Sequence, residues 1–159
     1  MSEPARILVI DDDESIRRTV SMTLQRAGYN VDTAENGKEA IQKAAAKFYN
    51  LAVIDIRLPD MEGTELLTTL KETTPKMVKI ILTGYPALQN AISAINKGVD
   101  AYLIKPLNTD VLLRLIQEHL DKQKREAEYS QERLAKFVET RFKELETEES
   151  AIAKATKKD

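Results

Sequence analysis

Acidic side chains crowd together near the start of the chain. Asp11, Asp12 and Asp13 follow directly after the apolar run Ile7–Ile10, with no basic residue between them. Carboxylates so close together repel one another, and a neighbouring apolar interior strengthens the repulsion. Two kinds of partner would relieve it: the backbone N–H groups at the start of a helix, which acidic residues cap, or a bound cation.

Three further polar residues end or follow later apolar runs. Asp55 closes "LAVID", Thr83 closes "KIILT", and Lys105 follows "AYLI". In an open parallel sheet the ligand binds beyond the carboxyl ends of the strands, so these side chains would meet the acidic run at one edge. Carboxylates there could hold Mg²⁺, which prefers oxygen ligands, and an aspartate beside the metal could attack phosphorus. Lys105 would offer a positive charge to a phosphoryl oxygen.

Short apolar runs alternate five times with amphipathic stretches, which predicts an α/β fold. Runs such as "LAVID" and "KIILT" are apolar almost throughout, as expected for central parallel strands covered on both faces, whereas the second run alternates and fits an edge. We predict a doubly wound (βα)5 fold whose five-stranded parallel sheet has the flavodoxin-like order 2-1-3-4-5. The strand candidates are Ile7–Ile10, Asn30–Thr33, Leu51–Asp55, Lys79–Thr83 and Ala101–Ile104.

Four amphipathic stretches are predicted to form the helices between these strands. Their apolar residues recur at helical spacing, and Gly28 and Gly98 stand where the first and fourth helices would end. The apolar positions are Ile16, Val20 and Leu24; Ala40, Ile41, Ala44 and Ala45; Leu66, Leu67 and Leu70; and Leu88, Ala91, Ile92 and Ile95.

The chain after Pro106 contains neither Gly nor Pro and is rich in strong helix formers. We predict a domain over residues 1–120, then a C-terminal helical extension over residues 121–159, a charged tail or linker whose end is disordered from about Ser150. One face of the tail could pair with a partner or a second copy, although polar residues interrupt a long heptad pattern; a charged, partly frayed helix is the alternative. The residues of that face are Leu134, Val138, Phe142 and Leu145, and the interruptions are Lys124, Ser130 and Gln131.

Composition limits the classes of function. The 159 residues include no cysteine, so disulfides and thiolate metal sites are excluded and a reducing compartment fits. The first residues lack the features of a secretion signal, and no apolar run is long enough to cross a bilayer, so we expect a cytoplasmic protein without a membrane partner. The net charge of −2 argues against direct contact with nucleic acid.

The motifs at the strand ends resemble the receiver domain of two-component response regulators, of the chemotaxis-regulator and nitrogen-regulator kind. The matching segments are "ILVIDDD" at 7–13, "AVIDIRLPDMEG" at 52–63, "ILTG" at 81–84 and "AYLIKP" at 101–106. One such motif alone is weak, but four in this order, each at a strand end, are a specific signal. The resemblance covers residues 5 to about 120.

The resemblance implies a phosphorylated aspartate and a metal. Asp55 would be the phosphoacceptor. Mg²⁺ would be the cofactor, held by Asp11, Asp12, Asp55 and the backbone carbonyl of Arg57. Arg57 lies two residues past Asp55, a place where family members vary, and it is expected to tune how fast the phosphate comes and goes.

The resemblance also implies how the phosphoryl group is held and sensed. Thr83, Gly84 and Lys105 would bind the phosphoryl group, and Pro106 would follow Lys105 through a cis bond in the turn. Thr83 and Tyr102 would form the switch: the threonine moves to the phosphate and the tyrosine turns into the vacated space. The face built from the fourth helix, the fifth strand and the final helix would then change shape.

The implied function is a phosphoacceptor module and not an enzyme. A sensor histidine kinase or a histidine phosphotransfer protein would phosphorylate Asp55, and a downstream protein would read the changed face. A homodimer could form through that face or through the tail. Tyr85, two residues past Thr83, is expected to tune the phosphate lifetime together with Arg57.

Three other interpretations remain on the sequence alone. The chain could be the receiver fragment of a longer regulator whose output domain, for example a DNA-binding domain, lies elsewhere. A pseudo-receiver that never takes phosphate normally lacks an acid, the lysine or the threonine, and none is missing here. An aspartyl-phosphate phosphatase acting on small substrates needs an Asp two residues after its nucleophile, where this chain has Arg57.

Overall fold

The computed structural model of the chain describes residues 3–84 and 99–156. The chain divides into two compact units, Met1–Leu120 and Asp121–Asp159, and each is described by itself. The predicted fourth helix with Gly98, and the expected role of Tyr85, lie outside the described residues. In the described part of the chain, no helix is long and apolar enough to cross a membrane.

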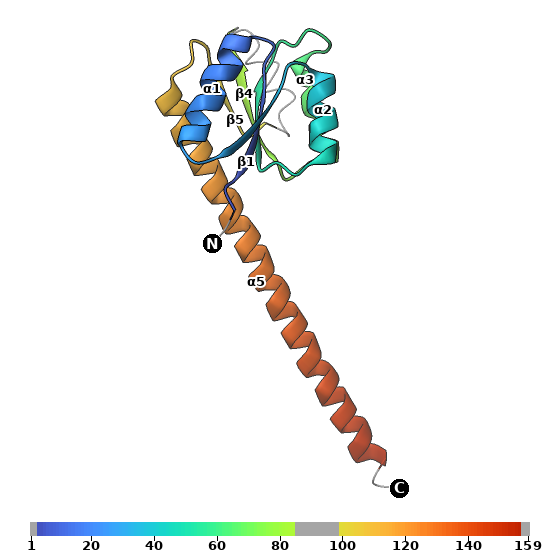
Figure 1. Ribbon diagram of the computed structural model, residues 1–159. Coiled ribbons are helices and arrows are strands. Elements are labelled where there is room, and N and C mark those ends of the chain that lie inside the picture. Colours follow the sequence, from blue (N-terminus) through green and yellow to red (C-terminus); the bar gives the residue numbers. More distant parts are fainter. Residues whose placement is uncertain (1–2, 85–98, 157–159) are drawn as a thin grey trace. The chain divides into compact units, whose positions relative to one another are not determined.

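A parallel five-stranded sheet forms the centre of the first unit (Figure 1). Its order, β2-β1-β3-β4-β5, is the predicted one, and the alternating second strand lies at an edge as expected. Each predicted strand boundary agrees with the structure to within one residue. The strands are β1 (Arg6–Ile10), β2 (Asn30–Ala34), β3 (Leu51–Asp55), β4 (Val78–Thr83) and β5 (Ala101–Ile104).

Helices cover both faces of this sheet, which confirms the doubly wound fold. Figure 1 shows α1 on one side and α2 and α3 on the other. The strands present alternate residues to two buried clusters: Leu8 and Ile54 pack with residues of α2 and α3, whereas Ile7 and Val53 pack with residues of α1 and the start of α5. The helices are α1 (Glu14–Arg26), α2 (Gly37–Ala46), α3 (Gly63–Thr73) and α5 (Thr109–Thr156).

Local sequence signals fix where these helices begin and end. Asn36 caps α2 by accepting a hydrogen bond from Glu39 N at 2.8 Å. Gly28 follows α1 with φ +99°, a left-handed conformation that disfavours side chains, and this confirms the predicted helix end. Ala45 is exposed, so its predicted place on the buried face of α2 is wrong; the buried stripe there runs through Ala40 and Ala44.

The second unit belongs to α5, which is described as helical to Thr156. Residues 150–156 are thus helical in the structure where disorder was predicted; their alanines, among the strongest helix formers, favour that conformation. All residues from Lys124 to Thr156 are exposed.

Candidate functional site

The carboxyl ends of β1 and β3 bring three acidic side chains together. Carboxylate oxygens of Asp11, Asp12 and Asp55 all lie within 4.8 Å of one another. The parallel register places these strand ends side by side, since Ile10 is opposite Ile54. Asp11 is 1% and Asp55 is 6% exposed, whereas Asp12 faces solvent. The crowded acids at the start of the chain therefore meet Asp55, as the strand-end pattern predicted.

Among the described residues, Lys105 is a basic side chain that reaches this cluster. Its Nζ lies 3.4 Å from Asp11 Oδ2 and 3.5 Å from Asp55 Oδ2. Burial, and next the charge of Asp11, raise the pKa of Asp55 to about 6, against the hydrogen bond from Arg57 N and the charge of Lys105. Three carboxylates thus face one ammonium group, and the negative charge that remains suits a divalent cation.

Asp13, the third acid of the run, has a different role. Its Oδ1 accepts a hydrogen bond from Ile16 N at 3.2 Å, so it is the N-cap of α1. Its own N–H donates to Asp11 Oδ1 at 2.9 Å, which orients that buried carboxylate. The two explanations offered for the acidic run therefore apply to different residues: Asp13 caps the helix, while Asp11 and Asp12 belong to the cluster.

Arg17 supports the acidic run from α1, and the sequence pattern did not identify it. Its guanidinium donates to the backbone carbonyls of Asp11 at 2.9 Å and Asp12 at 3.2 Å. It also lies 3.4 Å from Glu35 Oε1. Because its partners in the run are carbonyl oxygens, Arg17 fixes the backbone that carries the acids and leaves their carboxylates available. The only sequence signal for this role is that Arg17 is a basic residue one turn into the helix that follows the acidic run.

The loop between β3 and α3 holds Arg57, the residue whose carbonyl was predicted as a metal ligand. Gly63 N donates to Ile56 O at 2.9 Å, and Arg57 forms an isolated bridge with Glu62, so the loop closes on itself. A Cβ at Gly63 would lie 2.6 Å from Ile56 O, a distance that real Cβ atoms essentially never show. Glycine at position 63 is therefore required for this closure.

Asp60 ties the same loop to the start of α2. Its two carboxylate oxygens accept from Gly37 N and Lys38 N, each at 2.9 Å. These two backbone N–H groups lower the pKa of Asp60, as expected for a carboxylate at a helix N-terminus. Met61 packs closely on Gly37, where an added Cβ would lie 2.3 Å from the methionine sulfur. The sequence marked this loop only as part of a motif and did not identify Asp60 as a contact.

The remaining predicted residues lie at the ends of β4 and β5. Thr83 is fully buried, and its carbonyl accepts from Lys105 N at 2.7 Å. Among the described residues, apart from its chain neighbours, none lies within 4 Å of the place where a Cβ at Gly84 would stand. Tyr102 is 44% exposed on the edge strand β5. The Lys105–Pro106 peptide bond is cis, as the resemblance implied.

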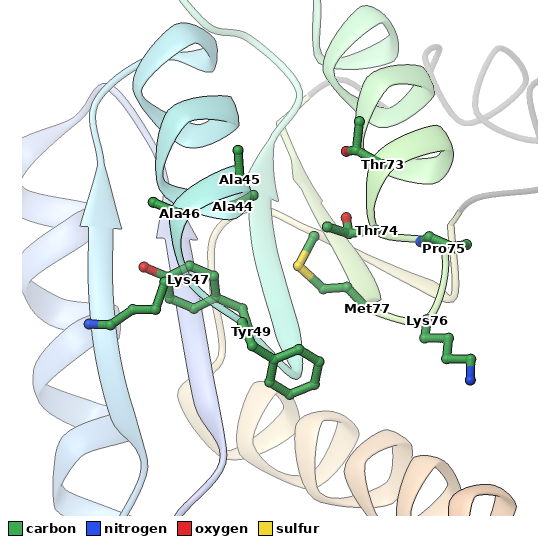
Figure 2. A pocket seen from close by; sticks show the side chains of 11 residues that line it. Ala44, Ala45, Ala46, Lys47, Tyr49, Thr73, Thr74, Pro75, Lys76 and Met77 are labelled. Atoms are coloured by element: carbon green, nitrogen blue, oxygen red, sulfur yellow. The ribbon is translucent and has the colours of Figure 1, made fainter.

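A separate hollow of about 420 Å³ lies between the C-terminal ends of α2 and α3 (Figure 2). Tyr49 and Met77 line it, and they precede β3 and β4, so it is at the opposite end of these strands from the acids. Figure 2 also shows Lys47 and Lys76 at this hollow. None of the described residues that line it carries a carboxylate, so they offer none of the chemistry of the acid cluster.

Known proteins with similar sequences include transcriptional regulators of Escherichia coli (strain K12). The chain is 32% identical over 119 residues to the transcriptional regulatory protein GlrR, a match covering 75% of this chain and 27% of that protein. It is 37% identical over 111 residues to the DNA-binding transcriptional regulator NtrC, covering 70% of this chain and 24% of that protein. The chain thus spans about a quarter of the length of these relatives.

Solved structures with the same fold include receivers that the chain matches over nearly their whole length. A CheY-like response regulator receiver domain protein from Methanospirillum hungatei JF-1 has a TM-score of 0.74 and 45% identity, covering 77% of this chain and 98% of that one. The response regulator TrrA from Thermotoga maritima, solved in complex with Mg(2+)-BeF, has a TM-score of 0.67 and 34% identity, covering 72% and 98%. Residues 7–117 also match the family described as the response regulator receiver domain. With this sheet order and these acids at its carboxyl edge, the chain belongs to the response regulator receiver family.

Proposed function

We propose that Asp55 accepts a phosphoryl group from the phosphohistidine of a sensor histidine kinase or a histidine phosphotransfer protein. Receiver domains are phosphoacceptors of two-component signalling that histidine kinases phosphorylate, and they are signalling modules rather than enzymes. One observation carries the assignment to Asp55: it is the acid of the cluster that ends the central strand β3, within 3.5 Å of Lys105 Nζ.

The oxygen donors around Asp55 fit Mg²⁺. The carboxylates of Asp11, Asp12 and Asp55 and the carbonyl of Arg57 would hold the ion, because a hard cation prefers oxygen ligands and the cluster keeps uncompensated negative charge. When bound, the metal neutralises charge on the phosphoryl oxygens. TrrA, which is 34% identical to this chain, was solved in complex with Mg(2+)-BeF, and this supports the proposal.

The chain's own groups would position and activate the nucleophile. At neutral pH the Asp55 carboxylate is ionised, because its pKa, although raised, is about 6. A carboxylate oxygen would attack phosphorus, so that a P–O bond forms while the P–N bond to imidazole breaks and the nitrogen keeps the electron pair. Lys105, which now reaches both Asp11 and Asp55, would move its ammonium group to a phosphoryl oxygen, beside Gly84.

Phosphorylation would then shift the ends of β4 and β5. An acyl phosphate carries up to about two negative charges, in place of the single charge of the carboxylate, beside Lys105 and the Thr83 hydroxyl. Thr83, buried at the end of β4, would hydrogen-bond the phosphate, and Tyr102, which is half exposed, would turn inward. Tyr102 and the first turns of α5 would give the surface that a downstream protein reads. Arg57, exposed beside the site, would tune the phosphate lifetime.

The output of this signal has two candidate routes. In the first, residues 1–120 act as the receiver and residues 121–159 as a tail, and the signal passes by contact with another protein. In the second, the receiver controls a further domain. The relatives support the second route, because the chain matches only about a quarter of the length of proteins named transcriptional regulators.

The assignment of Asp55 is tested by labelling the full chain with acetyl phosphate in the presence of Mg²⁺. Intact mass spectrometry should show one added phosphoryl group on the wild type and none on Asp55→Asn. Asp13→Asn is the matched control, because Asp13 lies in the same acidic run but caps α1 instead of joining the cluster. Stoichiometric labelling of Asp55→Asn would place the acceptor at another residue.

A further inference from the structure

The tail half of α5 exposes many large apolar side chains. Within residues 121–156 these side chains are between 48% and 68% exposed: Tyr129, Leu134, Phe137, Val138, Phe142, Leu145 and Ile152. Contiguous apolar surface of this kind marks an interaction site on a protein in water. Even a helix rich in strong helix formers gains most of its stability from packing against a partner. The tail therefore presents a surface suited to a partner.

Part of this surface follows the spacing of a two-stranded coiled coil. Steps of four and three residues from Gln131 to Ile152 give a seam with five apolar positions out of seven. We call this stripe the tail seam; its residues are Gln131, Ala135, Val138, Phe142, Leu145, Glu149 and Ile152. Val138 and Leu145, the central members, are 57% and 48% exposed.

The charges on the two sides of the tail seam indicate whether two tail helices would pair in a parallel or an antiparallel direction. The flank that follows Gln131, Val138 and Leu145 is entirely acidic, and the opposite flank is mixed. An antiparallel partner of the same sequence would lay the acidic flank along itself, with Glu facing Glu. The acidic flank is Glu132, Glu139 and Glu146, and the mixed flank is Leu134, Arg141 and Glu148.

A parallel partner of the same sequence avoids that repulsion. In parallel pairs each mixed-flank residue meets the position five residues later on the other helix, which is Glu139 for Leu134, Glu146 for Arg141 and Ala153 for Glu148. Arg141 would then face Glu146 of the second copy, and Leu134 would face Glu139. Arg141 now pairs with Glu144 of its own helix at 3.0 Å, but both side chains are more than half exposed, at 55% and 56%. Such an exposed pair is weak enough to rearrange.

We propose that residues 131–152 pair in parallel with the same segment of a second copy of this chain. The flanks are complementary in this one direction, through Arg141 and Glu146 of the second copy, while Glu149 near the end of the tail seam meets its own counterpart. This proposal rests on the tail alone and is independent of the phosphoryl chemistry at Asp55.

Disulfide cross-linking tests the direction, because the chain has no cysteine of its own. Gln131→Cys and Ile152→Cys occupy the two ends of the tail seam. In the parallel pair, each variant should form a covalent dimer by itself on oxidation. In an antiparallel pair centred on the seam, like ends would lie roughly 30 Å apart, and cross-links would form only when the two variants are mixed. Thr140→Cys, on the opposite face of α5, is the control and should stay monomeric in the denaturing gel.

Light scattering tests whether the tail seam itself holds the pair. Wild-type chain should have twice the monomer mass, and Val138→Glu with Leu145→Glu should have half the mass of wild type. Thr140→Glu with Thr147→Glu adds the same two charges on the outward face and should stay dimeric. A monomeric wild type, a seam variant that stays dimeric, or cross-links confined to the mixed sample would overturn the proposal. A chain that stays monomeric by itself and binds through the tail seam only to a different protein would overturn it as well.

Discussion

Asp55 is buried beside a second carboxylate, and this arrangement opposes the ionised form that its chemistry requires. The pKa of Asp55 is raised to about 6, which still leaves it charged at neutral pH. Lys105 offsets part of the repulsion by lying between Asp11 and Asp55, at 3.4 and 3.5 Å. A strained electrostatic balance of this kind is typical of functional sites, where residues are selected for reactivity over stability.

Asp60 provides a test of how the metal ligands are positioned. Asp60→Ala removes both bonds to the start of α2, so the loop that carries Arg57 loses its hydrogen-bonded tie to that helix and keeps only the packing of Met61 on Gly37. We expect Mg²⁺ binding to weaken by up to about 10-fold, the low end of what loss of an orienting group costs. Asn36→Ala is the matched control, because Asn36 caps the same helix from outside the loop. It should cost about 1 kcal/mol of stability yet leave the affinity unchanged.

Calorimetry of Mg²⁺ binding and urea unfolding of both variants separate the two effects. Equal affinities for Asp60→Ala and Asn36→Ala, at equal loss of stability, would reduce Asp60 to an ordinary helix cap. A selective loss of affinity in Asp60→Ala would mean that the loop reaches its ligand geometry through α2.

The sequence indicated the charged residues of the site but not the groups that orient them. Asp11, Asp55 and Lys105 could be identified because each stands at the end of an apolar run, and the carboxyl ends of parallel strands share one edge. Arg17 and Asp60 could not, because their partners are backbone carbonyls and N–H groups. Any residue could supply these partner groups, so the sequence shows no complementary residue type for Arg17 or Asp60.

At the scale of elements, strand positions were easier to predict than helix faces. A central strand is buried on both faces, so an uninterrupted apolar run identifies it, as in β3 and β4. The buried face of a helix depends on where its stripe of apolar residues is centred. Alanine gives little information about that position, because it occurs on buried and on exposed helix faces alike. Ala44 and Ala45 are adjacent, and only Ala44 is buried.

The edge strand β2 is tied to the rest of the sheet by a hydrogen bond that depends on pH. Tyr49, buried just before β3, donates its hydroxyl to Asp32 Oδ2 at 2.6 Å. This bond, together with the neighbouring Lys47, lowers the pKa of Asp32 below its ordinary 3.8, while burial and Asp32 raise the pKa of Tyr49. A lowered carboxyl pKa adds stability above pH 3.8, and that stability is lost as the pH falls through the lower folded value.

Tyr49→Phe removes this hydrogen bond and keeps the ring. At pH 7 the variant should be less stable than wild type by about 1 kcal/mol. The difference should shrink as the pH falls below 3.8, because wild type then loses the contribution that the variant already lacks. Urea unfolding at pH 7 and near pH 3 measures both values. A difference that stays constant or grows toward low pH would mean that Asp32 is not linked to Tyr49 in this way.

At the scale of the whole molecule, the two units differ in what holds them together. The buried core of the first unit uses side chains between Ile7 and Ile116, whereas every described residue from Lys124 onward is exposed. Hydrophobic burial is the main stabilising contribution to a domain of this size, so the first unit contains what it needs to fold. The tail adds exposed ion pairs such as Lys143 with Glu139, which contribute little.

Removal of residues 121–159 tests this division. The truncated chain should unfold cooperatively, with a Tm within about 5 °C of wild type, because no residue of the buried core is lost. It should also take one phosphoryl group from acetyl phosphate, since every residue assigned to the site lies before position 107. Scanning calorimetry and intact mass spectrometry give the two readings. Loss of cooperative unfolding would mean that the tail stabilises the receiver, and the boundary at Leu120 would then not separate independent units.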